Sequence, residues 1–300
     1  MSEWVLSIEG TEAGHRAAMF LALLAAFLHA VFGSLQKGRI DPWLSRGAID
    51  AAQVVLALPI ALFLVPHPVG SEWLLIMGAL PIHFVYKLGM ALAYSRGAFT
   101  VVYPVVRGMG PVFTVIGAYF VFNEVFTLVQ WLGVLVLLAG IFGLAVYNLK
   151  TIQVARDTLV PALWLAAGTG ALVAFYTTYD AYAIRGTPDP FTFLAWFFVI
   201  CSLDMPILAA LRWRKMTTRP ELGTLTRLGI SGALIAFGSF GSVMLATRLV
   251  KVGEPAVLRE TSTVFAALIG WLILRETVGP RRIALMTLIA VGAVIVELGG

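Results

Sequence analysis

Charged residues are scarce in this chain. Its 300 residues include 21 basic and 16 acidic residues, or 12 % of the total, whereas 60 % are hydrophobic. A typical soluble domain is about 25 % charged. A soluble globule of this length would need more charge to cover its surface, so most of that surface must face lipid. The composition therefore excludes a soluble protein and predicts an integral membrane protein with the lipid bilayer as its surroundings.

Cysteine and clustered positive charge are also lacking. Cys201 is the only cysteine, which excludes an internal disulfide and a cysteine-based metal cluster. The net charge is +5, but the basic residues lie between apolar runs and form no polyelectrolyte patch. We therefore expect no nucleic-acid partner, no metal and no cofactor.

Long apolar stretches make up most of what is present. A bilayer core of about 30 Å requires roughly 20 apolar residues per helix. Ten such stretches occur, at about 16–36, 47–65, 72–94, 100–122, 126–148, 159–184, 190–211, 226–249, 255–274 and 281–297. The connections are short and leave no room for a soluble domain. The sequence therefore predicts an all-α membrane protein with ten transmembrane helices.

The second half of the chain repeats the first. A shift of 152 residues places Arg96 on Arg248, Arg107 on Arg259 and Glu124 on Glu276, and a shift of 148 places Lys37 on Arg185. Matched charges are hard to obtain by chance where charges are rare. We therefore predict two five-helix repeats, 1–150 and 151–300. Because five is odd, the second repeat is inverted relative to the first, as in many secondary transporters.

Basic residues predict how the chain lies in the membrane. Fourteen of them flank the odd-numbered connections, whereas four flank the termini and the even-numbered connections. The positive-inside rule then places the odd-numbered connections in the cytoplasm and both termini outside. We expect a multi-pass protein of the bacterial inner (plasma) membrane.

A few charged and aromatic residues within the apolar stretches are the candidate site. A charge inside a membrane helix costs about 2.5–3.5 kcal/mol, so it needs a reason. In the third stretch His83, Lys87 and Tyr94 share one helical face, and the sixth stretch carries Tyr176, Tyr179 and Asp180. Lys87, Arg107 and Arg259 can be neutralised by Asp180, Asp204 and Glu260, so some of these charges could be structural ion pairs.

The fourth and ninth stretches add the two buried arginines. Pro111 lacks an amide hydrogen and clashes with the Arg107 carbonyl, which predicts a helix kink between Pro104 and Pro111 beside Tyr103. An interrupted membrane helix that carries a charge indicates a binding site, although the kink could also serve packing alone. In the ninth stretch Arg259 and Glu260 follow a proline. From their positions, Arg107 and Arg259 are expected to bracket the membrane midplane from opposite leaflets.

These features resemble one known family. Ten helices in two halves, the segment from Tyr103-Pro104 to Gly110-Pro111, and Glu124 and Glu276 after the fourth helix of each half resemble EamA-type members of the drug/metabolite transporter superfamily. The resemblance implies a proton- or gradient-linked carrier, or an exchanger, for small metabolites. Many members are described with both termini in the cytoplasm, which differs from the orientation that the basic residues predict.

We therefore expect a secondary transporter, an exporter or exchanger, of a small anionic or zwitterionic metabolite such as an amino acid or a phosph(on)ate compound. Arginine matches carboxylate and phosphate groups bidentately. Substrate would bind at Arg107, Lys87, Arg259, Tyr103, His83, Tyr94, Tyr176 and Tyr179, and Glu260 or Asp180 would carry a proton or form an ion pair. The protein would act as a monomer or a homodimer.

Three other functions stay open at this point. One is a flippase for a lipid-linked headgroup. Another is a membrane-embedded hydrolase, for which the sequence offers little support: it has no His-Glu-x-x-His, no Gly-x-Ser-x-Gly and no paired histidines at metal-ligand spacing. The third is a receptor or scaffold without transport activity, for which the short connections leave little contact surface. We therefore do not expect an enzyme.

Overall fold

The computed structural model describes residues 2–35, 40–96, 99–151, 156–272 and 279–300, and all regular secondary structure in these ranges is helical. The helices are α1 (Ser2–Ile8), α2 (Glu12–Leu35), α3 (Pro42–Phe63), α4 (Glu72–Arg96), α5 (Phe99–Phe122), α6 (Leu128–Thr151), α7 (Arg156–Gly186), α8 (Pro190–Ile200), α9 (Asp204–Lys215), α10 (Leu222–Leu249), α11 (Gly253–Leu258), the 3₁₀ turn η1 (Arg259–Thr261), α12 (Ser262–Leu272) and α13 (Pro280–Leu298).

Two helix starts show how local sequence sets these bounds. Asp41 precedes α3, and its carboxylate accepts hydrogen bonds from the backbone amides of Trp43 (2.9 Å) and Leu44 (3.3 Å). Asp189 caps α8 in the same way through the amide of Thr192, at 2.8 Å. A proline follows each aspartate at the first helical position, where its missing amide hydrogen costs nothing. Both short connections therefore end in a well-defined helix start.

Two of the predicted stretches are interrupted. The stretch 190–211 is not one helix: α8 ends at Ile200 and α9 begins at Asp204, whose carboxylate accepts from the Met205 amide at 2.6 Å. The ninth stretch divides into α11, η1 and α12, so that Arg259 and Glu260 lie in a 3₁₀ turn between two helices. In both places the break coincides with charged residues within an apolar stretch. Discontinuous helices of this kind are where membrane transporters form ion and substrate sites.

By length and composition, seven segments of the described chain are able to cross a membrane: 12–33, 42–63, 72–90, 105–122, 128–147, 190–215 and 222–249. They agree with seven of the ten predicted stretches. The molecule is thus an all-helical protein with several helices suited to a bilayer, while the count of ten stays a prediction.

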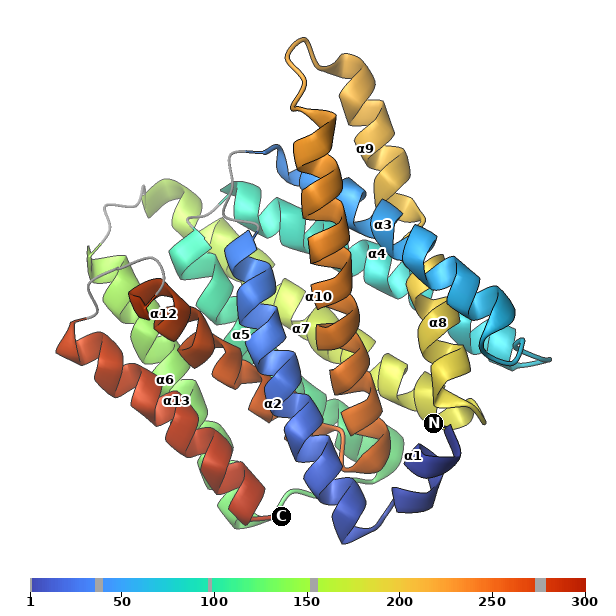
Figure 1. Ribbon diagram of the computed structural model, residues 1–300. Coiled ribbons are helices and arrows are strands. Elements are labelled where there is room, and N and C mark those ends of the chain that lie inside the picture. The colour runs from blue at the N-terminus through green and yellow to red at the C-terminus, as the bar shows by residue number, and fades with distance from the viewer. Residues whose placement is uncertain (1, 36–39, 97–98, 152–155, 273–278) are drawn as a thin grey trace.

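The packing of the helices relates the two halves of the chain. α2 packs on α10 and α12, whereas α7 packs on α4 and α5, so the first long helix of each half packs on helices of the other half. α6 and α13, the last helix of each half, pack tightly side by side (Figure 1). Both chain ends lie on one side of the molecule, and α9 with the start of α10 projects on the opposite side (Figure 1). The resulting arrangement brings α7, α10 and η1 together around a small pocket.

Candidate functional site

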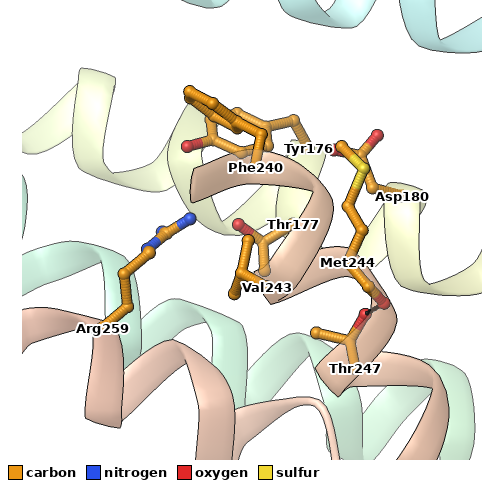
Figure 2. A pocket seen from close by; sticks show the side chains of 8 residues that line it. All are labelled: Tyr176, Thr177, Asp180, Phe240, Val243, Met244, Thr247 and Arg259. Carbon is orange, nitrogen blue, oxygen red and sulfur yellow. Dashed lines mark hydrogen bonds between the residues drawn. The ribbon is translucent and has the colours of Figure 1, made fainter. Parts of the chain in front are cut away.

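A small pocket of about 10 Å³, which is room for about one water molecule, lies between α7, α10 and η1. Its lining residues are Tyr176, Thr177, Asp180, Phe240, Val243, Met244, Thr247 and Arg259. Figure 2 shows Arg259 reaching from η1 toward the space between α7 and α10, with Asp180 on the far side. One pocket thus carries a cationic group and an anionic group on opposite walls, with an apolar surface from α10 between them.

Arg259 is buried and has no partner for its charge among the residues that the structure describes. The residue is 4 % exposed. Its Nε makes no hydrogen bond to any residue that the structure describes, and its guanidinium forms no ion pair with the described carboxylates. A buried charge without a partner is costly, and a guanidinium presents several donors to a planar anion. Arg259 is therefore the group of this pocket best suited to bind a carboxylate or a phosph(on)ate.

Arg107 holds the turn that carries Arg259. Its Nε lies 2.8 Å from Glu260 Oε2, and its Nη2 donates to Ser262 Oγ (2.7 Å) and to the Arg259 carbonyl (3.2 Å). Arg107, Glu260 and Ser262 are all buried. The Arg259 backbone thus lies directly against the Arg107 side chain, while the expectation that the two arginines bracket the midplane from opposite leaflets stays a prediction. Glu260 compensates the charge of Arg107, so Arg107 acts on the pocket through η1.

His83 and Asp180 form a second buried pair. Nε2 of His83 lies 2.9 Å and 3.1 Å from the two carboxylate oxygens of Asp180. The imidazole also contacts the rings of Tyr176 (4.7 Å between centroids) and Phe197 (4.9 Å). The contacts fix His83 behind the wall of the pocket, while Asp180 itself lines it. Asp180 therefore presents a carboxylate that is already oriented by a hydrogen bond.

Lys87 lies in a different cluster, at the break between α8 and α9. Its Nζ donates to Asp204 Oδ1 (2.7 Å), Asp50 Oδ2 (2.9 Å) and the Cys201 carbonyl (2.6 Å). Nε of Arg46 lies 2.9 Å from the other oxygen of Asp50. Two cations and two carboxylates thus balance each other, and Lys87 uses all three of its donors. The pairing with Asp204 follows the neutralisation that the sequence indicates, and it holds Lys87 apart from the pocket lining.

The tyrosines predicted for the site divide into three groups. Tyr176 lines the pocket. Tyr179 instead donates from its hydroxyl to the Leu75 carbonyl at 3.0 Å and lines a groove of about 490 Å³ between α5 and α7 on the outer face of the molecule. Tyr94 lies in α4 and Tyr103 in α5, but their side chains, like that of Pro104, lie outside the described part of the structure. Pro111 is buried in α5, which continues to Phe122, and the predicted kink stays a prediction.

Four pocket residues of α10 were not predicted from the sequence. Phe240, Val243, Met244 and Thr247 line the pocket without carrying a charge that would mark them. Their spacing of three, four and seven residues places them on one face of a helix. The spacing is a signal present in the sequence, but every apolar membrane helix contains such spacings, so it becomes informative only when Arg259 is known to face α10.

The helical architecture and the buried pocket define an integral membrane protein with a polar site among its helices. The family model described as the EamA-like transporter family matches twice, at residues 16–146 and 160–298. The chain belongs to this family, whose members are transporters of the drug/metabolite transporter type. The double match agrees with the repeat that the matched charges indicate.

Two further comparisons were informative about the fold but not about the substrate. A solved structure described as "Crystal structure of protein" has a TM-score of 0.74 to this chain at 18 % identity, and the match covers 94 % of this chain and 98 % of that chain. At this identity the likeness shows a shared fold. The search of curated proteins finds no match.

Proposed function

We propose that the protein is a secondary transporter that carries a small anionic or zwitterionic metabolite by alternating access. The observation that supports the proposal is the guanidinium of Arg259, which has no ion-pair partner among the described residues, in a pocket whose other charged lining residue, Asp180, is paired with His83. In a state with a wider pocket, a carboxylate or phosph(on)ate bound there would satisfy the donors of Arg259, and the carboxylate of Asp180 on the opposite wall would accept an ammonium group. Phe240, Val243 and Met244 give the space between them an apolar wall.

Two buried carboxylates are the proposed proton sites. Glu260 is 1 % exposed beside Arg107, and Asp180 is 3 % exposed beside His83. A proton on either would change the charge of the pocket by one unit and so alter its affinity for an anion. With an inverted repeat, the same pocket would face each side of the membrane in turn.

A flippase for a lipid-linked headgroup is less well supported. Such a protein needs a route from the bilayer to the charged pocket. The outer groove between α5 and α7 is lined by Phe175, Thr178 and Tyr182, which lie on the other side of α7 from Tyr176, Thr177 and Asp180. Because α7 stands between the groove and Arg259, we favour a substrate that enters from water.

The test is a binding panel on the purified protein. Lactate, alanine, methylphosphonate and inorganic phosphate are compared for thermal stabilisation and for uptake into proteoliposomes. We expect at least one of them to stabilise the protein and to be transported, and Arg259→Gln to abolish both effects while the protein still inserts and stays monodisperse. Arg16→Gln, which changes an arginine whose side chain is 71 % exposed, serves as the control. Full transport by Arg259→Gln would contradict the proposal.

A further inference from the structure

On the side of the molecule that carries both chain ends, two arginines each donate hydrogen bonds to backbone carbonyls at the end of the other arginine's helix. Arg185, at the end of α7, donates from Nε to the Thr247 carbonyl (2.9 Å) and from Nη2 to the Val250 carbonyl (2.7 Å) at the end of α10. Arg248, at the end of α10, donates from Nη1 to the carbonyls of Ile184 and Thr187 (2.8 Å for Thr187) at the end of α7. Each helix therefore has its last carbonyls satisfied by an arginine of the other helix.

Glu124 joins a third segment to this pair. One of its carboxylate oxygens lies 2.9 Å from Nη1 of Arg185, and the other accepts from the backbone amide of Val252 at 2.6 Å. Val252 directly precedes α11, which leads to η1 and Arg259. We call Glu124, Arg185 and Arg248 the arginine clasp. It connects the ends of the three segments that form the pocket, namely α7, α10 and the α11–η1 segment.

The clasp is continuous with the pocket wall. Thr247 lines the pocket with its side chain, and its carbonyl accepts from Arg185. Away from the clasp, α7 packs mainly on α4 and α5, whereas α10 packs mainly on α2 and α3. The pocket thus lies at a seam between two helix groups, and the clasp holds this seam together at one end.

The bonds of the clasp are of a kind that water can replace. The side chain of Arg185 is 25 % exposed and that of Glu124 11 % exposed, so water can reach the Arg185 and Glu124 bonds, whereas the side chain of Arg248 is 7 % exposed and becomes hydrated only as the helix ends separate. Helix-end carbonyls are routinely hydrated when they have no protein partner. A charged, partly hydrated link between two helix groups separates more easily than an apolar contact of tightly interdigitated side chains.

Resting on the proposed transport function, we infer that the arginine clasp is the gate that closes the pocket toward the side carrying both chain ends, and that this side opens when the clasp breaks. The gate consists of the Arg185 bonds to the end of α10, the Arg248 bonds to the end of α7, and the Glu124 link to Val252. Its opening separates α7 from α10 next to Thr247 and exposes Arg259 from that side.

The test measures access to the pocket without needing a substrate. Cys201→Ser removes the only cysteine, and Thr247→Cys places a reporter thiol in the pocket lining. In proteoliposomes of known orientation, the rate of reaction with a membrane-impermeant thiol reagent is measured from each side. We expect Glu124→Gln and Arg185→Gln each to raise the rate of labelling about tenfold from the side with the chain ends. The loss of one charge-assisted hydrogen bond from the closed state shifts the opening equilibrium by about this factor. From the other side we expect no increase.

A matched arginine provides the control. Arg212→Gln breaks the Arg212–Asp41 pair (3.1 Å) on the opposite side of the molecule and should leave the rate from the chain-end side unchanged. An unchanged rate in Glu124→Gln and Arg185→Gln together with a lower melting temperature would overturn the inference, because the clasp would then be a static brace. Equal increases from both sides would also overturn it, as general loosening. The labelling experiment needs no substrate, so its outcome tests the gate independently of the binding panel. If no compound in the panel binds, that result counts against the proposed function and not against the gate.

Discussion

At the scale of single residues, the structure separates buried charges that have an ion-pair partner from one that has none within the described ranges. Lys87, Arg107 and Arg259 look alike in the sequence, as isolated cations in apolar stretches. Lys87 is held by two carboxylates and a carbonyl, and Arg107 by Glu260 and Ser262, whereas the guanidinium of Arg259 makes no ion pair with the described residues. The sequence could place all three inside the membrane from composition alone. It could not rank them, because helical spacing shows which face a residue occupies and not what the facing helix offers.

The Lys87 cluster gives the first prediction. Lys87→Met keeps an unbranched side chain of similar size but removes the cation, so that Asp50 keeps only Arg46 and Asp204 loses its ion pair with Lys87. Removing one member of a buried ion pair costs about 3–5 kcal/mol, because a carboxylate is left uncompensated. We expect a clearly lower melting temperature in detergent, partly restored in Lys87→Met/Asp204→Asn, in which the charges balance again.

The double variant also tests whether Lys87 binds substrate. If Lys87→Met/Asp204→Asn is stabilised by the same compounds as the unaltered protein, Lys87 acts on the fold. Loss of that response at restored stability would return Lys87 to the substrate site. Arg16→Gln, which removes an exposed partner of Glu12, is the control for stability and should leave the melting temperature unchanged.

At the scale of helices, the composition predicted most segments because lipid imposes a simple requirement. Every span needs roughly 20 apolar residues, so the stretches 47–65 and 72–94 correspond closely to α3 and α4. The break between α8 and α9 and the 3₁₀ turn at Arg259 were not predicted. Both depend on contacts from distant helices, namely Lys87 donating to the Cys201 carbonyl and Arg107 donating to the Arg259 carbonyl. A window of local sequence contains neither partner.

The contact between α6 and α13 gives the second prediction. Gly133 and Gly140 share a face of α6, as expected for helices that approach closely, and α13 contributes Gly292. A Cβ added to Gly292 would meet the Leu137 amide nitrogen and, at 2.6 Å, the Gly133 carbonyl oxygen. Because these are backbone atoms, the helices would have to move apart. We expect Gly292→Val to lower the stability by about 1–3 kcal/mol, the usual cost of overpacking.

A glycine on α7 provides the control for this prediction. A Cβ added to Gly168 would meet nothing within 4 Å. Gly168→Ala should therefore leave the melting temperature unchanged or raise it, since alanine favours a helix over glycine. Equal melting temperatures for Gly292→Val and Gly168→Ala would show that the close approach of α6 and α13 does not contribute to stability.

At the scale of the whole molecule, the matched charges of the two halves link sequence, packing and gating. Arg107 and Arg259, paired by the repeat, meet at the pocket through a hydrogen bond at 3.2 Å. Arg185, Arg248 and Glu124 also belong to matched pairs, and they are the residues of the arginine clasp. Their partners in the repeat are Lys37, Arg96 and Glu276; Lys37 and Glu276, and the side chain of Arg96, lie outside the described part of the structure. Charges that the duplication preserves in segments with few charges therefore coincide with Arg259 in the pocket and with the proposed gate, whereas the aromatic residues divide between the pocket and the outer groove.

The orientation in the membrane is the last prediction. α9, the connection 216–221 and the start of α10 lie on the side of the molecule opposite both chain ends (Figure 1), and they carry five exposed basic residues, Arg212, Arg214, Lys215, Arg219 and Arg227. Under the positive-inside rule this projecting segment lies in the cytoplasm and the chain ends lie outside. In the Cys201→Ser background, Thr218→Cys marks the projecting segment and Ser7→Cys marks α1. A membrane-impermeant maleimide applied to intact cells should react with the cysteine at position 7 at once and with that at position 218 only after permeabilisation. The reverse pattern would mean that the basic residues of this chain do not determine its topology, and the arginine clasp would then close the pocket toward the cytoplasm.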